Sequence, residues 1–250
     1  MQATARHQLK RWLPPLLLIL AGVLAYWNSF DGVFVYDDLD SIRDNPHIRK
    51  LWPLSEAMSL PLWSSALTVD GRPLLSLSLA LNQHVFGPEP WGYHLVNLLI
   101  HIGAGLLLFG IVRRTLHLPR FRGRCPGNPT WLSLAVALIW LVHPLQTESV
   151  TYIVQRSESL MGMLFLLTVY CAIRGFTSDK GGRWYVAAVI ACACGMGVKQ
   201  TMFSVPLLVL LYDYTFNGGF APGGLALGER EAGSTLPCVP RGSSSSASSD

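Results

Sequence analysis

The sequence has 250 residues, half of them apolar, and only 14% of them carry a charge. Soluble domains usually carry about 25% charged residues, so this composition predicts a protein that lies in a lipid membrane. The net charge of +4 does not indicate a nucleic-acid partner, because basic residues crowd residues 113–124 and acidic residues crowd residues 31–89. The positive-inside rule of membrane topology produces this segregation of charge.

The first apolar run, Leu13–Phe30, follows a basic segment and is long enough to cross a hydrocarbon core of about 30 Å. We expect residues 1–12 to form a cytoplasmic N-terminus. A cleaved signal peptide is the alternative, because Val23-Leu24-Ala25 resembles a cleavage site. Later apolar runs place the protein in the membrane under either interpretation.

A long polar loop, residues 31–92, follows the first run. Within it, Pro73–Phe86 is apolar on one side and is short for a membrane span. This pattern predicts an amphipathic helix that lies at the membrane interface.

Five further apolar runs predict more spans: Tyr93–Val112, Trp131–Val142, Leu160–Ile173, Trp184–Val198 and Met202–Phe216. Basic connections between alternate runs place that side in the cytoplasm. Residues 13–216 are therefore expected to form an all-α, polytopic transmembrane bundle of about six spans. The compartment is a bacterial inner membrane or the endoplasmic reticulum, with the polar loops facing the periplasm or lumen.

The last segment, residues 217–250, is rich in Gly, Ser and Pro. Such a composition buries too little apolar surface to offset the entropy of ordering the chain. We expect a disordered tail.

Two adjacent acids, Asp37 and Asp38, come a few residues after the first run. Carboxylates at a membrane surface can accept a proton from a nucleophile or hold a divalent cation. A solvated loop is the alternative. We expect no other cofactor and no further metal site.

Three polar residues lie on one face of the second predicted span. His94, Asn97 and His101 stand at i, i+3 and i+7. Polar groups inside a span usually face the bundle interior or a water-filled cavity. They could bind a phosphate, form hydrogen bonds between helices or line a transport pathway.

A dense polar patch between two apolar runs carries His143, Glu148, Arg156 and Glu158. Such a patch is costly in a membrane unless it borders a polar site. Arg156 could hold a lipid-borne phosphate through two hydrogen bonds, or it could pair with one of the two glutamates. Two further cations on the same outer side, Arg72 and Lys199, are candidates for a phosphate headgroup.

Six short motifs occur in an order that resembles a known family. They are Phe34-Val-Tyr-Asp-Asp38, Gly71-Arg-Pro73, Trp91-Gly-Tyr-His-Leu-Val-Asn97, His143-Pro-Leu-Gln-Thr-Glu-Ser-Val150, Val154-Gln-Arg-Ser-Glu158 and Gly197-Val-Lys-Gln200. They resemble the membrane half of the transmembrane and tetratricopeptide-repeat proteins, a group that includes animal O-mannosyltransferases. That half is similar to glycosyltransferases of the GT-C class.

The resemblance implies transfer of a sugar from a polyprenyl-phosphate donor to a protein or glycan hydroxyl. It places a catalytic acid at Asp37 or Asp38, and it places phosphate-binding cations at Arg72, Arg156 and Lys199. The expected partners are membrane lipid, the donor lipid and the acceptor.

Two departures qualify the resemblance. The family usually has Lys-Glu where this sequence has Lys199-Gln200, and it continues with more spans and repeat helices beyond Phe216. We therefore expect a truncated member of the family, either active or an inactive fragment. A non-catalytic membrane scaffold and a transporter are the rival functions.

Overall fold

The computed structural model describes residues 2–58, 69, 71–121 and 127–217. Within these ranges the chain forms helices and no strand, which confirms the predicted all-α class. The predicted disorder of the tail from residue 218 onward lies outside the described residues and stays a prediction.

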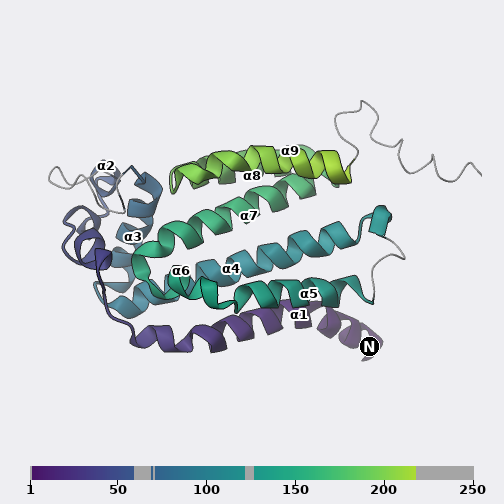
Figure 1. Cartoon of the computed structure of the whole chain (residues 1–250), viewed down its shortest axis with the longest axis horizontal. Coiled ribbons are helices and arrows are strands. Elements are labelled where there is room, and N and C mark those ends of the chain that lie inside the picture. Colours follow the sequence, from purple (N-terminus) through teal and green to yellow (C-terminus); the bar gives the residue numbers. More distant parts are fainter. Residues whose placement is uncertain (1, 59–68, 70, 122–126, 218–250) are drawn as a thin grey trace, which may run out of the picture.

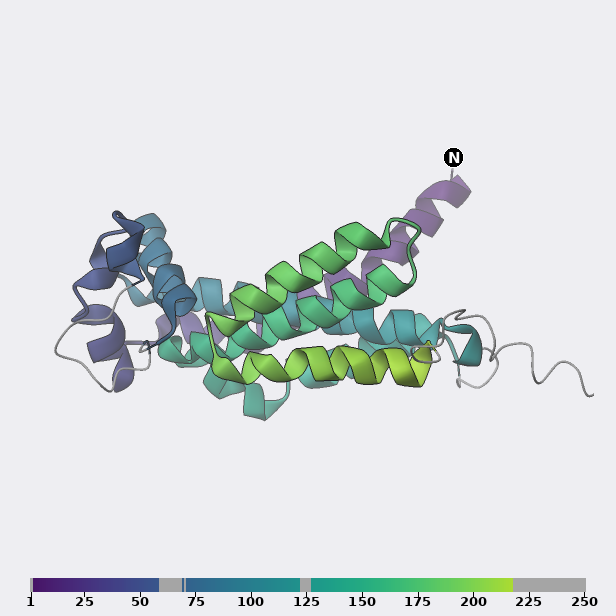
Figure 2. The same ribbon diagram turned by 90° about the horizontal axis from the view of Figure 1, so that it is seen from above.

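The longer helices of the described ranges lie side by side and alternate in direction (Figures 1 and 2). They are α1 Gln2–Tyr26, α4 Pro90–Leu116, α5 Pro129–Leu141, α7 Arg156–Phe176, α8 Gly181–Met196 and α9 Val205–Phe216. Each corresponds to one predicted apolar run, and the structure extends the second and fourth runs at both ends.

Among the described residues, three segments are long and apolar enough to cross a membrane: Arg11–Asp31, Pro90–Leu116 and Ile153–Phe176. A fourth crossing exists if Pro129–Leu141 and Pro144–Thr151, which meet at 54°, count as one bent span. Helices α8 and α9 have 16 and 12 residues, fewer than the roughly 20 that a span requires. The predicted six crossings are therefore present as helices, but length and composition support three or four of them as spans.

The two ends of the bundle differ in what they carry. Polar segments gather at one end: residues 27–58, residues 71–89, residues 142–155 and the turn from α8 to α9 (Figure 1). The N-terminus, the α7–α8 connection and the end of α9 lie at the other end. The predicted outer loops thus share one end of the bundle, as alternating spans require.

Glycines allow α4 to approach its neighbours closely. A Cβ on Gly105 would lie 2.8 Å from Leu141 Cδ1 of α5, and a Cβ on Gly110 would lie 2.8 Å from the Tyr170 ring of α7. Small residues of this kind hold membrane helices together because packing replaces the hydrophobic effect there. Helix α4 is therefore the centre of the bundle.

The polar loop after α1 folds into its own small layer over the end of α4. It contains η1 Trp27–Asp31, η2 Leu39–Arg43, η3 His47–Arg49, α2 Leu54–Ala57 and α3 Pro73–Phe86. The bounds of α3 are those predicted for the amphipathic helix. Its buried face, with Leu75 and Leu79, packs on Ile48 of η3 and Tyr93 of α4 in one core.

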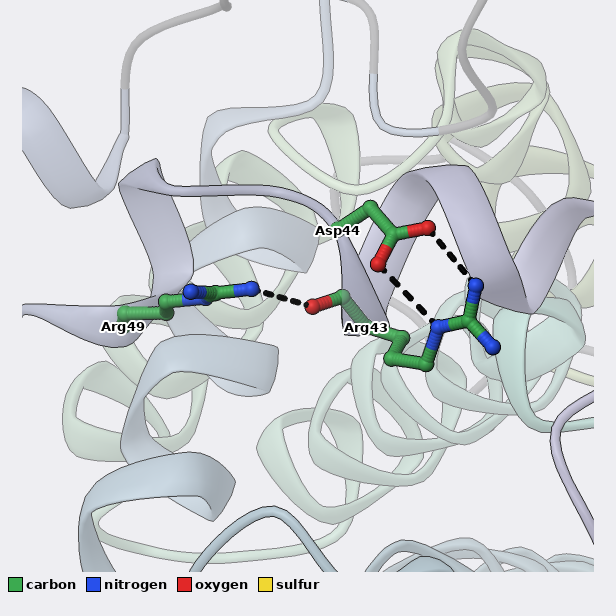
Figure 3. Close-up of polar contacts among 3 residues, drawn as sticks. All are labelled: Arg43, Asp44 and Arg49. Atoms are coloured by element: carbon green, nitrogen blue, oxygen red, sulfur yellow. Dashed lines mark hydrogen bonds and ion pairs between the residues drawn. The ribbon is translucent and has the colours of Figure 1, made fainter.

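Polar contacts also hold this layer together (Figure 3). Asp44 accepts two hydrogen bonds from the Arg43 side chain, at 2.9 and 3.1 Å. Arg49 donates to the backbone carbonyl of Arg43 at 2.8 Å. These exposed contacts fix the turn between η2 and η3, so the loop has a defined shape.

The remaining short elements are η4 Pro119–Phe121, η5 Pro144–Gln146, α6 Thr147–Thr151, η6 Ile153–Gln155 and η7 Gln200–Ser204. Of these, η5, α6 and η6 connect α5 to α7 at the polar end of the bundle. Of the predicted polar patch, Glu148 lies in α6, His143 caps η5, and Arg156 and Glu158 lie in the first turn of α7.

Candidate functional site

The two adjacent acids have different surroundings. Asp38 is fully buried, and its carboxylate accepts hydrogen bonds from the backbone N–H of Val35 at 3.2 Å and of Val154 at 2.8 Å. Burial raises the pKa of the Asp38 carboxyl, although these two hydrogen bonds lower it. Asp37 is exposed. Of the pair, Asp37 is therefore the acid open to a substrate, and Asp38 anchors the loop.

The segment just before α7 holds the acidic loop at two points. The Tyr152 hydroxyl accepts a hydrogen bond from the Asp37 backbone N–H at 3.2 Å, and the Val154 N–H binds Asp38. Burial raises the pKa of the Tyr152 phenol, the bond from Asp37 lowers it, and the charges of Asp37, Asp38 and Glu148 raise it. The raised pKa keeps the Tyr152 phenol protonated at neutral pH.

Arg156 is fully buried at the start of α7. Its guanidinium donates to Asn97 Oδ1 at 2.6 Å, to Asn82 Oδ1 at 2.8 Å, and to the carbonyls of Ser78 and Tyr93 at 3.2 and 3.0 Å. It contacts neither glutamate, contrary to the structural alternative considered for it. The guanidinium instead joins α3, α4 and α7, and in this arrangement it is not open to a phosphate.

A cavity of about 320 Å³ opens between α6 and the start of α7. It is lined by Leu145, Glu148, Ser149, Gln155 and Glu158. Glu158 forms an ion pair with Lys199, which precedes η7. The structure thus brings Glu148 and Glu158 to one cavity and pairs Glu158 with Lys199, which is 41 residues further along the chain.

Arg72 approaches the same region from the outer layer. It precedes α3 and is half-buried. Two residues later, Leu74 N–H donates to the Gly197 carbonyl at 3.1 Å. The segments that carry Arg72 and Lys199 are therefore neighbours, as a shared phosphate site requires.

The polar face of α4 mostly serves packing. Asn97 donates to the Ile153 carbonyl at 3.2 Å, and the His101 ring binds the Leu141 carbonyl at 2.8 Å. His94 is buried, and a Cβ on Gly32 would lie 2.7 Å from its Nε2. Within the described chain, neither ring nitrogen of His94 has a hydrogen-bond partner. Of the readings considered for this face, Asn97 and His101 fit hydrogen bonding between helices.

His143 is exposed and has a local role. Its Nδ1 accepts a hydrogen bond from the Leu145 N–H at 3.2 Å and caps η5. Among the described residues, no hydrogen bond or ion pair joins the His143 side chain to another predicted site residue.

No group of three or more His, Cys, Asp or Glu side chains within the described ranges is placed to hold a metal ion. Both oxygens of Asp38 already accept backbone N–H groups. A divalent cation at Asp37 and Asp38 stays a prediction, and the roles of the other site residues do too.

Three residues of this region were not predicted from the sequence: Asn82, Tyr152 and Gln155. Asn82 and Tyr152 hold Arg156 and the acidic loop, and Gln155 lines the cavity. Gln155 lies within the motif Val154–Glu158, and Tyr152 lies between that motif and His143–Val150. Their closeness to Arg156 in sequence could have identified them as site residues. Nothing in the sequence distinguished Asn82 from its polar neighbours on α3.

Residues 70–217 identify the family. These residues match the model of the family described as dolichyl-phosphate-mannose-protein mannosyltransferase. The chain belongs to this family. The match covers α3 to α9, including the cavity, Arg156 and Lys199, and it confirms the predicted glycosyltransferase resemblance.

Curated relatives agree with this assignment. The chain is 30% identical over 202 residues to the mouse protein O-mannosyl-transferase TMTC2, covering 77% of this chain and 23% of that protein. It is 32% identical over 205 residues to the Drosophila melanogaster Tmtc2, covering 78% and 21%. It is 30% identical over 231 residues to human TMTC4, covering 83% and 30%.

The chain thus spans less than a third of the length of these relatives. No solved structure matches it. The chain is a multi-pass membrane protein of the mannosyltransferase family.

Proposed function

We propose that this chain forms the membrane part of a glycosyltransferase that moves a sugar from a polyprenyl-phosphate donor to a hydroxyl group of a protein or glycan. Membership of the mannosyltransferase family supports this proposal, and mannose is the sugar that the family description names. The observation that carries it is the exposed Asp37, whose backbone N–H binds the hydroxyl of Tyr152 at the end of α6, the helix that contributes Glu148 and Ser149 to a polar cavity.

The proposed chemistry uses Asp37 as the base. The Asp37 carboxylate takes the proton of the acceptor hydroxyl, whose oxygen then bonds to the anomeric carbon of the sugar as the bond to the donor phosphate breaks. The lipid phosphate leaves with the negative charge that this bond carried. Cations placed near developing charge stabilise it strongly, and Lys199 and Arg72 are the cations of this region that are not enclosed in the core.

Arg156 takes a supporting part in this proposal. Its four hydrogen bonds tie the start of α7, which borders the cavity, to α3 and α4, and Val154, two residues before it, binds Asp38. We therefore assign Arg156 to positioning the acidic loop and not to contact with the phosphate.

A scaffold function is the second candidate, and one observation favours it. Asp38 and Arg156 are satisfied by neighbours inside the fold, as a purely structural role would require. The transporter function has less support, because His101 packs against Trp140 and Tyr26 and binds a carbonyl.

Transfer of labelled mannose from a polyprenyl-phosphate donor to membrane or secreted protein tests the proposal. The assay uses two membrane preparations. One contains the chain itself, and the other contains a hybrid protein in which residues 1–217 of this chain replace the matching part of mouse TMTC2. Transfer by either protein above empty membranes is the expected result. Absence of transfer by the hybrid, at an abundance where the mouse protein is active, would favour the scaffold.

We also propose that the polar end faces the lumen or periplasm and that the N-terminus is cytoplasmic. In a chain without native cysteines, a membrane-impermeant thiol reagent applied from outside the cytoplasm should label Ser55→Cys in α2. It should spare Asp179→Cys in the α7–α8 connection. Both positions are exposed, so the reverse pattern of labelling would overturn the orientation.

A further inference from the structure

We propose that the cavity between α6 and α7 is the subsite for the sugar ring of the donor, and that Glu148 and Gln155 select a neutral hexose there. This inference rests on the proposed function and adds a ligand, a location and two specificity-determining residues to it. Gln155 has no role in any step derived above.

The size of the cavity limits its occupant. Its volume is about 320 Å³, at the small end of the roughly 300–1,000 Å³ that ligand pockets span. A single sugar ring suits this volume better than an oligosaccharide does. The exposed Leu145 lines one side and offers an apolar surface, which the C–H face of a sugar ring can cover.

The hydrogen-bonding groups of the cavity suit a polyhydroxyl ligand. A glutamine amide both donates and accepts, whereas an ionised carboxylate only accepts. Sugar hydroxyls can serve both kinds of group. Among the described residues, the side chains of Gln155 and Glu148 have no hydrogen-bond partner, so both are available to a ligand.

Charge decides which part of the donor lies in the cavity. Glu148 and Glu158 line it. A phosphate group there would be repelled by these carboxylates. The ion pair of Glu158 with Lys199 places a cation at one border of the cavity. The sugar therefore occupies the cavity, and the phosphate lies on the Lys199 side.

This arrangement also fits the proposed base. Tyr152 holds the backbone of Asp37 and lies within the field of Glu148. A sugar bound at Glu148 thus has Asp37 on one side and Lys199 on another. An acceptor hydroxyl and a leaving phosphate need separate positions of this kind around the anomeric carbon.

Binding of two lipids by the purified chain in neutral detergent tests the proposal. The probes are polyprenyl-phosphate mannose and the same polyprenyl phosphate without sugar. We expect the parent chain to bind the mannosylated lipid about tenfold more tightly, as one or two net hydrogen bonds provide. Gln155→Ala should reduce this preference to less than about twofold.

Glu148→Gln should reduce the preference in a second way, because bare phosphate should bind more tightly once the carboxylate is gone. Glu89→Gln removes an exposed carboxylate before α4 and should leave the preference unchanged. If one variant unfolds, the other still decides, since the two are measured independently. An equal preference in the parent and in both variants, or no preference in the parent, would overturn the subsite.

The binding assay contains no acceptor and needs no turnover. A chain that discriminates between the lipids but transfers no sugar would contradict the proposed function and leave the subsite standing. A chain that transfers sugar with a preference insensitive to both variants would contradict the subsite alone.

Discussion

Replacing Arg156 by alanine is expected to destabilise the protein by about 4 kcal/mol. The guanidinium donates to four acceptors on α3 and α4, and two of these are the buried amide oxygens of Asn82 and Asn97. Each buried group left without a partner costs roughly 1–3 kcal/mol, and hydrogen bonds to a charged group are among the stronger ones. The measurement is the unfolding midpoint in detergent.

Arg156→Lys is not expected to rescue this loss. A lysine ammonium is a compact point charge and cannot reach four acceptors that match a planar fork. Arg113→Ala provides the control, because Arg113 is exposed at the opposite end of α4. Equal unfolding midpoints for Arg156→Ala and Arg113→Ala would show that the buried network contributes little.

Composition and hydrophobic runs were sufficient to predict the helices, because each long apolar run must form a helix in lipid. The amphipathic helix Pro73–Phe86 was predicted with the bounds that the structure gives it. Its start is fixed by Pro73, whose missing N–H is tolerated in the first turn. The number of spans was harder to predict, because α8 and α9 fall short of the bilayer thickness and their length alone does not decide whether they cross.

The site was predicted as a list of residue types and not as an arrangement. Sequence reasoning placed Arg156 near a phosphate, since an isolated cation in an apolar region needs an anion or several acceptors. The structure supplies neutral acceptors, Asn82 and Asn97, from α3 and α4. Contacts over more than fifty residues depend on how the helices pack, and one sequence contains no direct record of that packing.

The acid pair shows the same limit on a smaller scale. Adjacent residues in an extended loop point in opposite directions, so the sequence predicted that one acid would face the site. The premise of an extended loop was wrong, since Asp38 has helical angles, φ −63° and ψ −32°, but the two acids still have different surroundings. The backbone determines which of them is exposed. Tyr36, just before the pair, has φ of +44°, a left-handed conformation that few non-glycine residues adopt. The chain turns there, Asp38 enters the core, and Asp37 stays exposed.

This difference between the two acids leads to opposite expectations for their amides. Asp38→Asn places an NH₂ group against a backbone N–H, of Val35 or of Val154, and so removes one acceptor from a buried pair of hydrogen bonds. We expect a loss of roughly 1–3 kcal/mol in stability and a lower abundance in membranes. Asp37→Asn should leave stability and insertion nearly unchanged, because the Asp37 side chain is exposed and the hydrogen bond to Tyr152 comes from the Asp37 backbone N–H, which the substitution retains.

For the rate of sugar transfer we expect a direct effect of Asp37→Asn, the substitution that leaves stability nearly unchanged. An acceptor hydroxyl is a poor nucleophile until a base takes its proton, and a positioned base contributes about 100- to 10,000-fold to the rate. Asp37→Asn retains the shape of the side chain and removes its basicity, so transfer of mannose should fall at least about 100-fold at unchanged abundance. Asp40→Asn, an exposed acid three residues away, should transfer at the parent rate. The hybrid with mouse TMTC2 gives the signal against which both are measured. If Asp37→Asn transfers as fast as Asp40→Asn, the proton goes elsewhere, and the acidic loop serves the fold alone.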